Sequence, residues 1–317
     1  MPKRTVAGIF VAVAAAVAGA VVWWPASRAS GRPHRLVVAS VRQPATGLLA
    51  FAGSSGCIGE QRLELQEQEF ALGRDALVLL RDRRADVAVA YEIPVLRAAF
   101  EDPRLRVLSE LHRSAENTRV VARRDRGVSS VEDLRGRRVG AAAGTNAEFF
   151  LDALLRFGGL READVERVNR EPPAAVDALL AGQLDAAALS DPFAHHAEVA
   201  LGARAVVLKT DLYLETSLLV TRDDVVAERR PALEALARAL ACAERRARER
   251  PDEVLAAMRA RFPAEGDLAR QLARVRWRIG LDHVLLDLLR REREWLDRRG
   301  TAGMPPDLAR LVEPAVL

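Results

Sequence analysis

The segment with the clearest binding chemistry is Gly144-Thr145-Asn146-Ala147-Glu148, which lies between an apolar stretch and an amphipathic one. Thr145 and Glu148 have capping-box spacing, in which the hydroxyl accepts a hydrogen bond from a free helix N–H and the carboxylate bonds back. Such a cap needs no ligand. The free N–H groups at a helix start also bind anions, and α/β proteins hold ligands at the carboxyl ends of strands. The pattern therefore predicts a capped helix, an anion site, or both.

Two earlier loops offer further polar groups. Arg74, in Gly73-Arg74-Asp75, follows an expected strand and begins an expected helix. Its planar guanidinium could clamp an oxyanion, although an arginine in a first helical turn is often only solvated. Gln43, in Gln43-Pro44-Ala45-Thr46, offers an amide suited to neutral hydrogen bonding.

Two acids follow apolar strands and precede a proline: Glu92 and Asp191. Paired carboxylates can act in acid–base chemistry, and they can equally cap the helices that begin there. The sequence contains no nucleophile elbow, Walker-type phosphate loop or metalloprotease helix. This favours binding over catalysis.

The elements that position these residues form a pattern that occurs twice, about a hundred residues apart. Residues 76–90 and 175–189 each read as an amphipathic helix, a polar turn and an Asp that opens a short apolar strand. A basic patch and another strand precede each copy, at 35–39 and 137–141. The repeat predicts two similar α/β lobes, and a cleft between them would take a small ligand.

Strands and helices alternate through most of the chain, which indicates mainly parallel sheets covered on both faces. We expect strands at 36–40, 63–70, 87–91, 106–111, 119–123, 138–142, 165–168, 205–208 and 216–221, helices at 48–56, 74–82, 94–100, 131–134, 146–157 and 194–200, and the helix and strand of the second repeat within 175–189. From Val225 onward the pattern predicts helices only, packed on the first lobe, at 228–250, 252–261, 268–275 and 282–298.

Composition excludes some classes of protein. The chain has 317 residues, half of them apolar, which is enough for one or two sizeable cores. The net charge is +4, but the basic residues are spread among acids and only 5% of residues are aromatic. This argues against base-stacking platforms. We therefore expect a solvated surface and no nucleic-acid partner.

The N-terminus predicts export. Lys3-Arg4 precedes an apolar run from Val6 to Trp24, with small residues up to Ala29. This matches a secretory signal in residues 1–29, and the run is also long enough for an uncleaved membrane anchor. In both cases we expect the remainder to be periplasmic or otherwise extracytoplasmic.

The two cysteines, Cys57 and Cys242, have no His or second Cys beside them, so a zinc or redox motif is not indicated. We expect two free buried thiols, with a disulfide as the alternative in an exported protein.

From about Arg35 to Leu317 the chain resembles the periplasmic solute-binding components of ABC importers for nitrate, taurine and alkanesulfonates. The segments that carry the resemblance are 73–77, 86–89, 113–117, 130–140, 144–150, 182–186 and 191–193, in this order and spacing. The resemblance implies an α/β, two-lobed periplasmic-binding-protein-like fold (type II Venus flytrap) with C-terminal helices packed on lobe 1. It implies lobe 1 at 30–116 and 216–317, and lobe 2 at 117–215.

The resemblance also implies that a ligand binds between the lobes and is delivered to an ABC permease. We expect a monomer with no cofactor, no metal and no catalytic residue. Ligand-facing candidates carried over position by position are Gln43, Gly73, Arg74, Glu92, Asn117, Thr145, Asn146 and Asp191. Two positions depart from the family pattern. Ser190 stands where an aromatic residue commonly precedes the acid-Pro-aromatic motif, and Cys57 stands where relatives tend to carry phenylalanine.

The expected function is capture of a small organic anion such as a sulfonate, without chemistry. Two alternatives stay open. The scaffold could host an enzyme similar to those menaquinone-pathway enzymes that resemble binding proteins, with Glu92 or Asp191 as the base. It could also be a membrane-tethered ligand sensor, if the N-terminal run is not cleaved.

Overall fold

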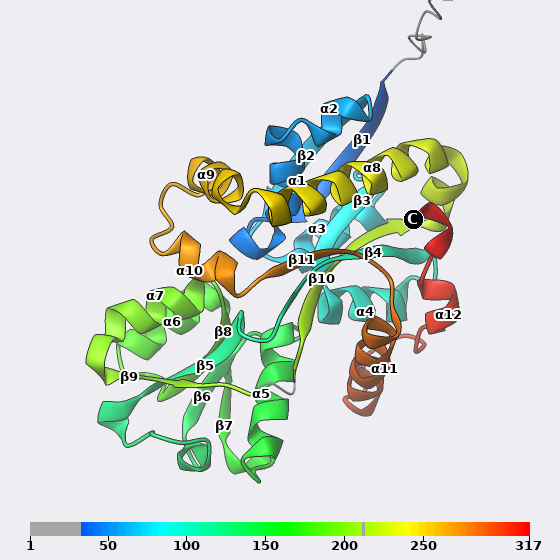
Figure 1. Cartoon of the computed structure of the whole chain (residues 1–317). Helices are drawn as coiled ribbons and strands as arrows, with labels where there is room; N and C mark the ends of the chain where they lie inside the picture. Colours follow the sequence, from blue (N-terminus) through cyan, green and yellow to red (C-terminus); the bar gives the residue numbers. More distant parts are fainter. Residues whose placement is uncertain (1–32, 211–212) are drawn as a thin grey trace, which may run out of the picture. The chain divides into compact units, whose positions relative to one another are not determined.

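A computed structural model describes residues 33–210 and 213–317, which contain a six-stranded and a five-stranded sheet (Figure 1). The expected signal or anchor at 1–29 lies outside the described residues. Within the described ranges, no helix combines the length and the apolar character needed to cross a bilayer.

The six-stranded sheet has the order β11-β4-β10-β3-β1-β2. Its strands β1, β2 and β3 are parallel to one another, and β10, β4 and β11 continue the sheet through antiparallel pairs. The bounds are β1 His34–Val41, β2 Leu63–Phe70, β3 Val87–Tyr91, β4 Leu105–Ser114, β10 Glu215–Arg222 and β11 Arg276–Gly280.

The five-stranded sheet has the order β7-β6-β8-β5-β9, and again three parallel strands are followed by antiparallel ones. The bounds are β5 Thr118–Arg123, β6 Arg138–Ala141, β7 Glu166–Asn169, β8 Ala186–Ser190 and β9 Ala205–Leu208. The chain passes between the sheets twice, from β4 to β5 and from β9 to β10 (Figure 1).

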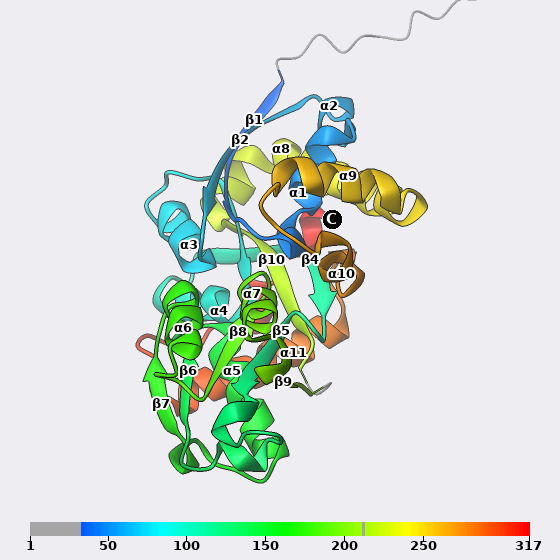
Figure 2. The same ribbon diagram turned by 90° about the vertical axis from the view of Figure 1, so that its left-hand side faces the viewer.

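Helices cover both faces of each sheet. The six-stranded sheet alternates its side chains between two apolar clusters: Val87 and Val89 of β3 join one, Ala88 and Ala90 the other. Figure 2 shows α1, α8 and α9 on one side of this sheet and α3 on the other. The covering helices are α1 Leu48–Ser54, α2 Cys57–Glu60, α8 Asp223–Glu249, α9 Pro251–Arg261 and α10 Leu268–Ala273 on the first side, and α3 Gly73–Arg81, α4 Glu92–Glu101, α11 His283–Arg298 and α12 Leu308–Leu311 on the second.

The five-stranded sheet is covered by α5 Asn146–Phe157 on one face and by α6 Pro172–Leu180 and α7 Phe193–Leu201 on the other. One residue of α11, Leu288, packs into the same cluster as α5. The C-terminal helices therefore pack on the first sheet as expected, and α11 also contacts the second.

The internal repeat corresponds to equivalent hydrogen bonds. Asp86 accepts from the backbone N–H of Val37 at 2.8 Å, and Asp185 accepts from that of Arg138 at 2.9 Å. In each case the Asp that opens one central strand ties it to the neighbouring parallel strand. The predicted similarity of the two α/β units is thus present in side-chain contacts as well as in strand order.

Two expectations about the elements were wrong. Residues beyond Val225 are not helical throughout, because β11 pairs with β4 through Arg276 and Trp277. This short edge strand is held by the Trp277 ring stacked on Phe51, a long-range contact that no local pattern announces. The expected helix 48–56 ends early because Gly56 adopts a left-handed conformation, φ 83°, and a separate helix begins after it.

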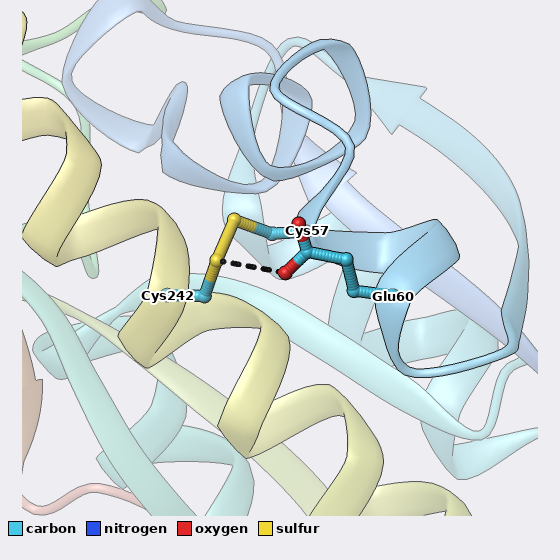
Figure 3. A group of neighbouring side chains, drawn as sticks. All are labelled: Cys57, Glu60 and Cys242. Carbon is cyan, nitrogen blue, oxygen red and sulfur yellow. Dashed lines mark hydrogen bonds between the residues drawn. A yellow bond between two sulfur atoms is a disulfide. The ribbon is translucent and has the colours of Figure 1, made fainter. Parts of the chain in front are cut away.

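The expectation of free thiols was also wrong, because Cys57 and Cys242 form a disulfide between α2 and α8 (Figure 3). Their sulfurs and the Glu60 carboxylate lie within 4.8 Å of one another, the one such group of three metal-ligand types found in residues 33–210 and 213–317. Disulfide sulfurs are not thiolates, the form that binds metals. Arg246 also pairs with Glu60 at 2.6 Å. These residues do not fit a metal ion in this state.

Candidate functional site

Between the two sheets lies a small cavity at the carboxyl ends of the parallel strands. The space open to water is about 50 Å³, room for a few water molecules. Its small size indicates a closed arrangement around the candidate residues. The lining residues are Val41, Gln43, Leu72, Gly73, Arg74, Tyr91, Pro94, Ala142, Thr145, Asn146, Ala147, Arg170, Pro172, Ala188, Leu189, Ser190 and Phe193.

The first turn of α5 borders this cavity with Thr145, Asn146 and Ala147. The Thr145 hydroxyl accepts from the Glu148 N–H at 3.4 Å, and Glu148 accepts from the Gly144 N–H at 2.7 Å. The predicted cap is therefore present, reaching back to Gly144. Because the N-terminal end of a helix carries a positive partial charge, this turn is suited to an anionic group.

Arg74 reaches the cavity from the start of α3 and forms an ion pair with Glu171, which precedes α6. Arg74 Nη2 and Glu171 Oε1 are 2.6 Å apart, and both side chains are about two-fifths exposed. The pair therefore joins the two sheet units at the solvent edge of the cavity. Gly73 packs so closely on Ala90 that an added Cβ would lie 2.8 Å from the Ala90 Cβ. Only glycine fits this approach of α3 to β3.

A chain of hydrogen bonds holds Gln43 in place. Tyr91, at the end of β3, donates to Gln43 Oε1 at 2.8 Å, and Asn117 donates to the Tyr91 hydroxyl at 3.3 Å. Asn117 is buried and does not line the cavity. It acts behind the lining by orienting Tyr91.

Glu215, at the start of β10, accepts hydrogen bonds from the first crossing, from the start of β5 and from α5. Its carboxylate accepts from Asn117, Thr118 and Asn146, the last at 3.0 Å. Burial raises the pKa of Glu215 to about 7, and these donors oppose the rise. Glu215 thereby fixes the Asn146 side chain at the cavity wall.

Glu92 lies behind the cavity, fully buried, and accepts from the Tyr213 hydroxyl and from the Thr216 N–H. Burial, with the nearby Glu215 charge, raises the pKa of Glu92 to about 8. Its carboxylate thus binds Tyr213 of the second crossing and Thr216 of β10 rather than serving mainly as a helix cap, and it does not line the cavity, where acid–base chemistry would require it.

Asp191 is buried as well and is bound by two arginines. Arg119 and Arg274 lie 2.7 Å and 3.2 Å from its carboxylate. Asp191 also accepts from the His195 N–H at 3.1 Å, which is the helix-cap reading of this residue. A carboxylate so occupied is poorly placed to serve as a base.

The structure thus brings five of the eight sequence candidates to one cavity and puts three behind it. Gln43, Gly73, Arg74, Thr145 and Asn146 line the space. Glu92, Asn117 and Asp191 are buried outside its lining.

Sequence reasoning missed several residues of this region. Tyr91 and Arg170 line the cavity, and Glu215 organises its wall. Tyr91 directly precedes Glu92 at a strand end, the same signal that pointed to Glu92. No local signal marks Glu215, because its partners are about 70 to 100 residues away.

In the described part of the chain, the lining of this cavity includes no Asp, Glu, His or Cys side chain. Hydroxyl, amide and guanidinium groups bind and orient a solute, but a general base needs a proton acceptor within reach of the substrate. The arrangement suits recognition better than acid–base catalysis.

Two α/β units with matching strand order, joined by two crossings around a small cavity, define the two-lobed fold of periplasmic binding proteins. The chain belongs to the NMT1/THI5-like family, whose model matches residues 27–254. The resemblance to the binding proteins of ABC importers is therefore confirmed at the level of family and fold. No curated protein sequence matches the chain significantly.

Solved structures share this fold. The periplasmic aliphatic sulphonate binding protein SsuA from Escherichia coli has a TM-score of 0.77 at 18% identity, over 88% of this chain and 97% of that one. The alkanesulfonate-binding protein SsuA from Xanthomonas axonopodis pv. citri, bound to MOPS, has a TM-score of 0.77 at 19% identity, over 90% and 100%. The desulfurization enzyme DSZB has a TM-score of 0.65 at 20% identity, over 88% and 97%. The same fold therefore occurs in binders and in an enzyme.

Proposed function

We propose that this protein is an extracytoplasmic solute-binding protein that captures a small organic anion in the cavity between its two sheets. The observation that carries the proposal is the lining, which offers the α5 helix start, Arg74, Gln43 and Asn146 and no carboxylate. Oriented N–H, amide and guanidinium donors replace the hydration shell of an anion. Binding then needs no bond to be made or broken.

Five residues are proposed to face the ligand: Gln43, Gly73, Arg74, Thr145 and Asn146. Glu92, Asn117 and Asp191 are proposed to support them from behind. An aliphatic sulfonate, taurine or nitrate is the proposed ligand class, because sulfonate-binding proteins share the fold. The serine at position 190, on the cavity wall, adds a hydroxyl where the family commonly carries an aromatic residue.

The proposed partner is an ABC permease, and the proposed location is the periplasm or outer face of the membrane. Ligand binding favours the closed arrangement by its differential contacts with both units, and a permease can recognise that state. We propose that the binding unit acts as a monomer.

Isothermal titration calorimetry on residues 33–317 tests the ligand class with taurine, ethanesulfonate and nitrate. Binding of at least one, weakened in Asn146→Ala and unchanged in the exposed variant Glu294→Gln, supports the site. Failure of all three to bind would retire the anion class while leaving the fold intact.

An enzyme on this scaffold is the second candidate, since DSZB shares the fold. The two are separated by recovering the ligand after long incubation with the protein and weighing it by mass spectrometry. A binding protein returns the solute unchanged, whereas a new product would favour catalysis. Sequencing the mature N-terminus would separate a released binding protein from a tethered sensor.

A further inference from the structure

A fully buried acid on α11 has no donor to hold it. Glu292 is 0% exposed, and no hydrogen-bond donor in the described residues reaches either of its carboxylate oxygens. It lies on the helix face that carries Leu285, Leu288, Leu289 and Leu296. An ionised carboxylate left unpaired in such surroundings is strongly disfavoured.

The neighbour of Glu292 is the second buried acid, Glu92 of α4, which is within hydrogen-bonding reach. Glu92 accepts from Tyr213 and from the Thr216 N–H, so donors already hold it. Two carboxylates in contact cannot both stay ionised away from water. Glu292 can therefore form a hydrogen bond with Glu92 when the two carboxyl groups share one proton.

The other charged and titratable groups that act on this pair do not supply a cation that could replace the proton. Glu215 of β10 adds negative charge to both acids, and Tyr213 donates from the second crossing. Tyr91 stands beside Glu92 in the chain, and Asp191 acts on Glu215. Arg291, on α11 itself, is a cation that acts on Glu292, and its effect is smaller than that of Glu92.

The pair lies where the two units are joined. Tyr213, which donates to Glu92, belongs to the second crossing and packs on Phe149 and Phe150 of α5. Helix α11 reaches the other unit through Trp295, whose Nε1 donates to Asp152 of α5 at 2.7 Å. A change at the Glu92–Glu292 contact therefore affects two connections between the sheets, the second crossing and helix α11.

We propose that Glu92 and Glu292 hold one proton between them, and that this proton keeps α11 and the second crossing in their closed arrangement. Loss of the proton leaves two buried negative charges in contact, which are relieved when water enters and the units separate. The cleft proposed above would then release its ligand more readily at alkaline pH. The proton pair itself does not depend on any ligand.

The direction in which stability changes with pH follows from the number of protons bound in the folded and unfolded states. Burial and the neighbouring acids raise the pKa at which this pair gives up its shared proton, which is about 8 at Glu92. The folded state therefore binds more protons than the unfolded state between about pH 4.5 and 8. Its stability from this source is complete below pH 4.5 and is lost as the pH rises through 8.

The informative substitution is Glu292→Gln, because the amide N–H₂ can donate permanently to Glu92 and take the place of the shared proton. In ligand-free protein, the unfolding equilibrium of the wild type should shift toward the unfolded state with rising pH between 5 and 8. Glu292→Gln should lower that slope by one proton, which is about tenfold in the equilibrium constant per pH unit. Glu294→Gln, exposed on the same helix, should keep the wild-type slope.

Small-angle scattering on the same ligand-free proteins reads the separation of the units. Wild type should expand above pH 8, and Glu292→Gln should not. An unchanged pH slope in Glu292→Gln would overturn the proposal. If that variant fails to fold, infrared titration of Glu215→Gln, which removes the third buried carboxyl, decides: a protonated carboxyl band at pH 7 that disappears near pH 8 supports the pair, and its absence refutes it. Because no ligand is present, failure here leaves the proposed binding function untouched.

Discussion

Arg74 and Glu171 form an ion pair at the edge of the cavity, 2.6 Å apart, although one begins α3 beside the six-stranded sheet and the other precedes α6 beside the five-stranded sheet. The cation proposed to meet an anionic ligand is thus already paired within the protein. The Glu171 carboxylate occupies one side of the same guanidinium that a sulfonate would approach, so protein and ligand anions compete for Arg74.

Removing that competitor should strengthen binding of an anion. Glu171→Gln is expected to raise ligand affinity by up to about fivefold, because exposed ion pairs are worth about 0.2–1 kcal/mol. Arg74→Gln should lower affinity by about tenfold or more, since hydrogen bonds to charged groups contribute about 1.5–3 kcal/mol. Calorimetry with the best of the three test anions measures both. Glu166→Gln, an exposed acid on β7 that does not line the cavity, is the matched control; a loss of affinity in Glu171→Gln would show that the pair serves closure.

The Thr145 cap gives a prediction about stability without ligand. Thr145→Ala removes the acceptor for the Glu148 N–H at the start of α5. The free energy of unfolding should fall by about 1 kcal/mol, within the 0.5–2 kcal/mol typical of such caps. Urea denaturation measures it, and Thr145→Ser should recover most of the loss because it keeps the hydroxyl. Equal stability of the alanine and serine variants would mean that the hydroxyl does not cap the helix.

The features that the sequence predicted correctly depend on residues that lie close together in the chain. The Asp residues that open β3 and β8 stand in a pattern of about fifteen residues, and both make the equivalent bond to a neighbouring strand. The α5 cap is likewise contained in four residues. Such features follow from periodicity and capping chemistry, so the fold class and the polar candidates at strand ends could be found without coordinates.

What the sequence did not predict depends on contacts across the chain. The partners of the disulfide are 185 residues apart, and β11 is a strand because Trp277 meets Phe51 and β4. Glu292 carried one signal that could have been used: an acid at the helical spacing of an apolar stripe. Its partner on α4 could not be named, because packing of two helices distant in the chain is set by the whole core.

The disulfide makes a further prediction for stability. Cys57 and Cys242 close a loop of 185 residues, so opening it should cost about 5 kcal/mol in the free energy of unfolding, by the chain-entropy account. Urea denaturation of the wild type with and without a strong reductant measures the change. The double variant Cys57→Ala, Cys242→Ala should be destabilised similarly and should not respond to reductant. Two free thiols counted in unreduced, denatured wild type would contradict the bond.

His112 predicts how the protein responds to acid. The imidazole is fully buried in β4, with Nδ1 2.7 Å from the Ser217 hydroxyl, its ring edge-on to Tyr91, and Nε2 without a partner. Burial lowers the pKa of His112 to about 3. The unfolded chain therefore takes up a proton near pH 6.5 that the folded chain refuses. Stability from this source is present above pH 6.5 and is lost as the pH falls toward 3, by up to about 1.4 kcal/mol per pH unit.

The stability that His112 loses as the pH falls opposes the stability that Glu92 gains over the same range of pH. Between about pH 6.5 and 4.5 the folded chain refuses one proton at His112, while it retains one at the Glu92–Glu292 pair and one at Glu215, so His112 cancels about half of that gain. Wild-type stability should therefore rise only gradually as the pH falls there, whereas that of His112→Gln should rise more steeply, by about one further proton in the slope. The slope of the unfolding free energy against pH is the measurement, because replacing a buried ring shifts its absolute value at every pH. His34→Gln, at the exposed start of β1, should follow the wild type, and an identical slope in His112→Gln would show that this histidine is protonated in the folded protein.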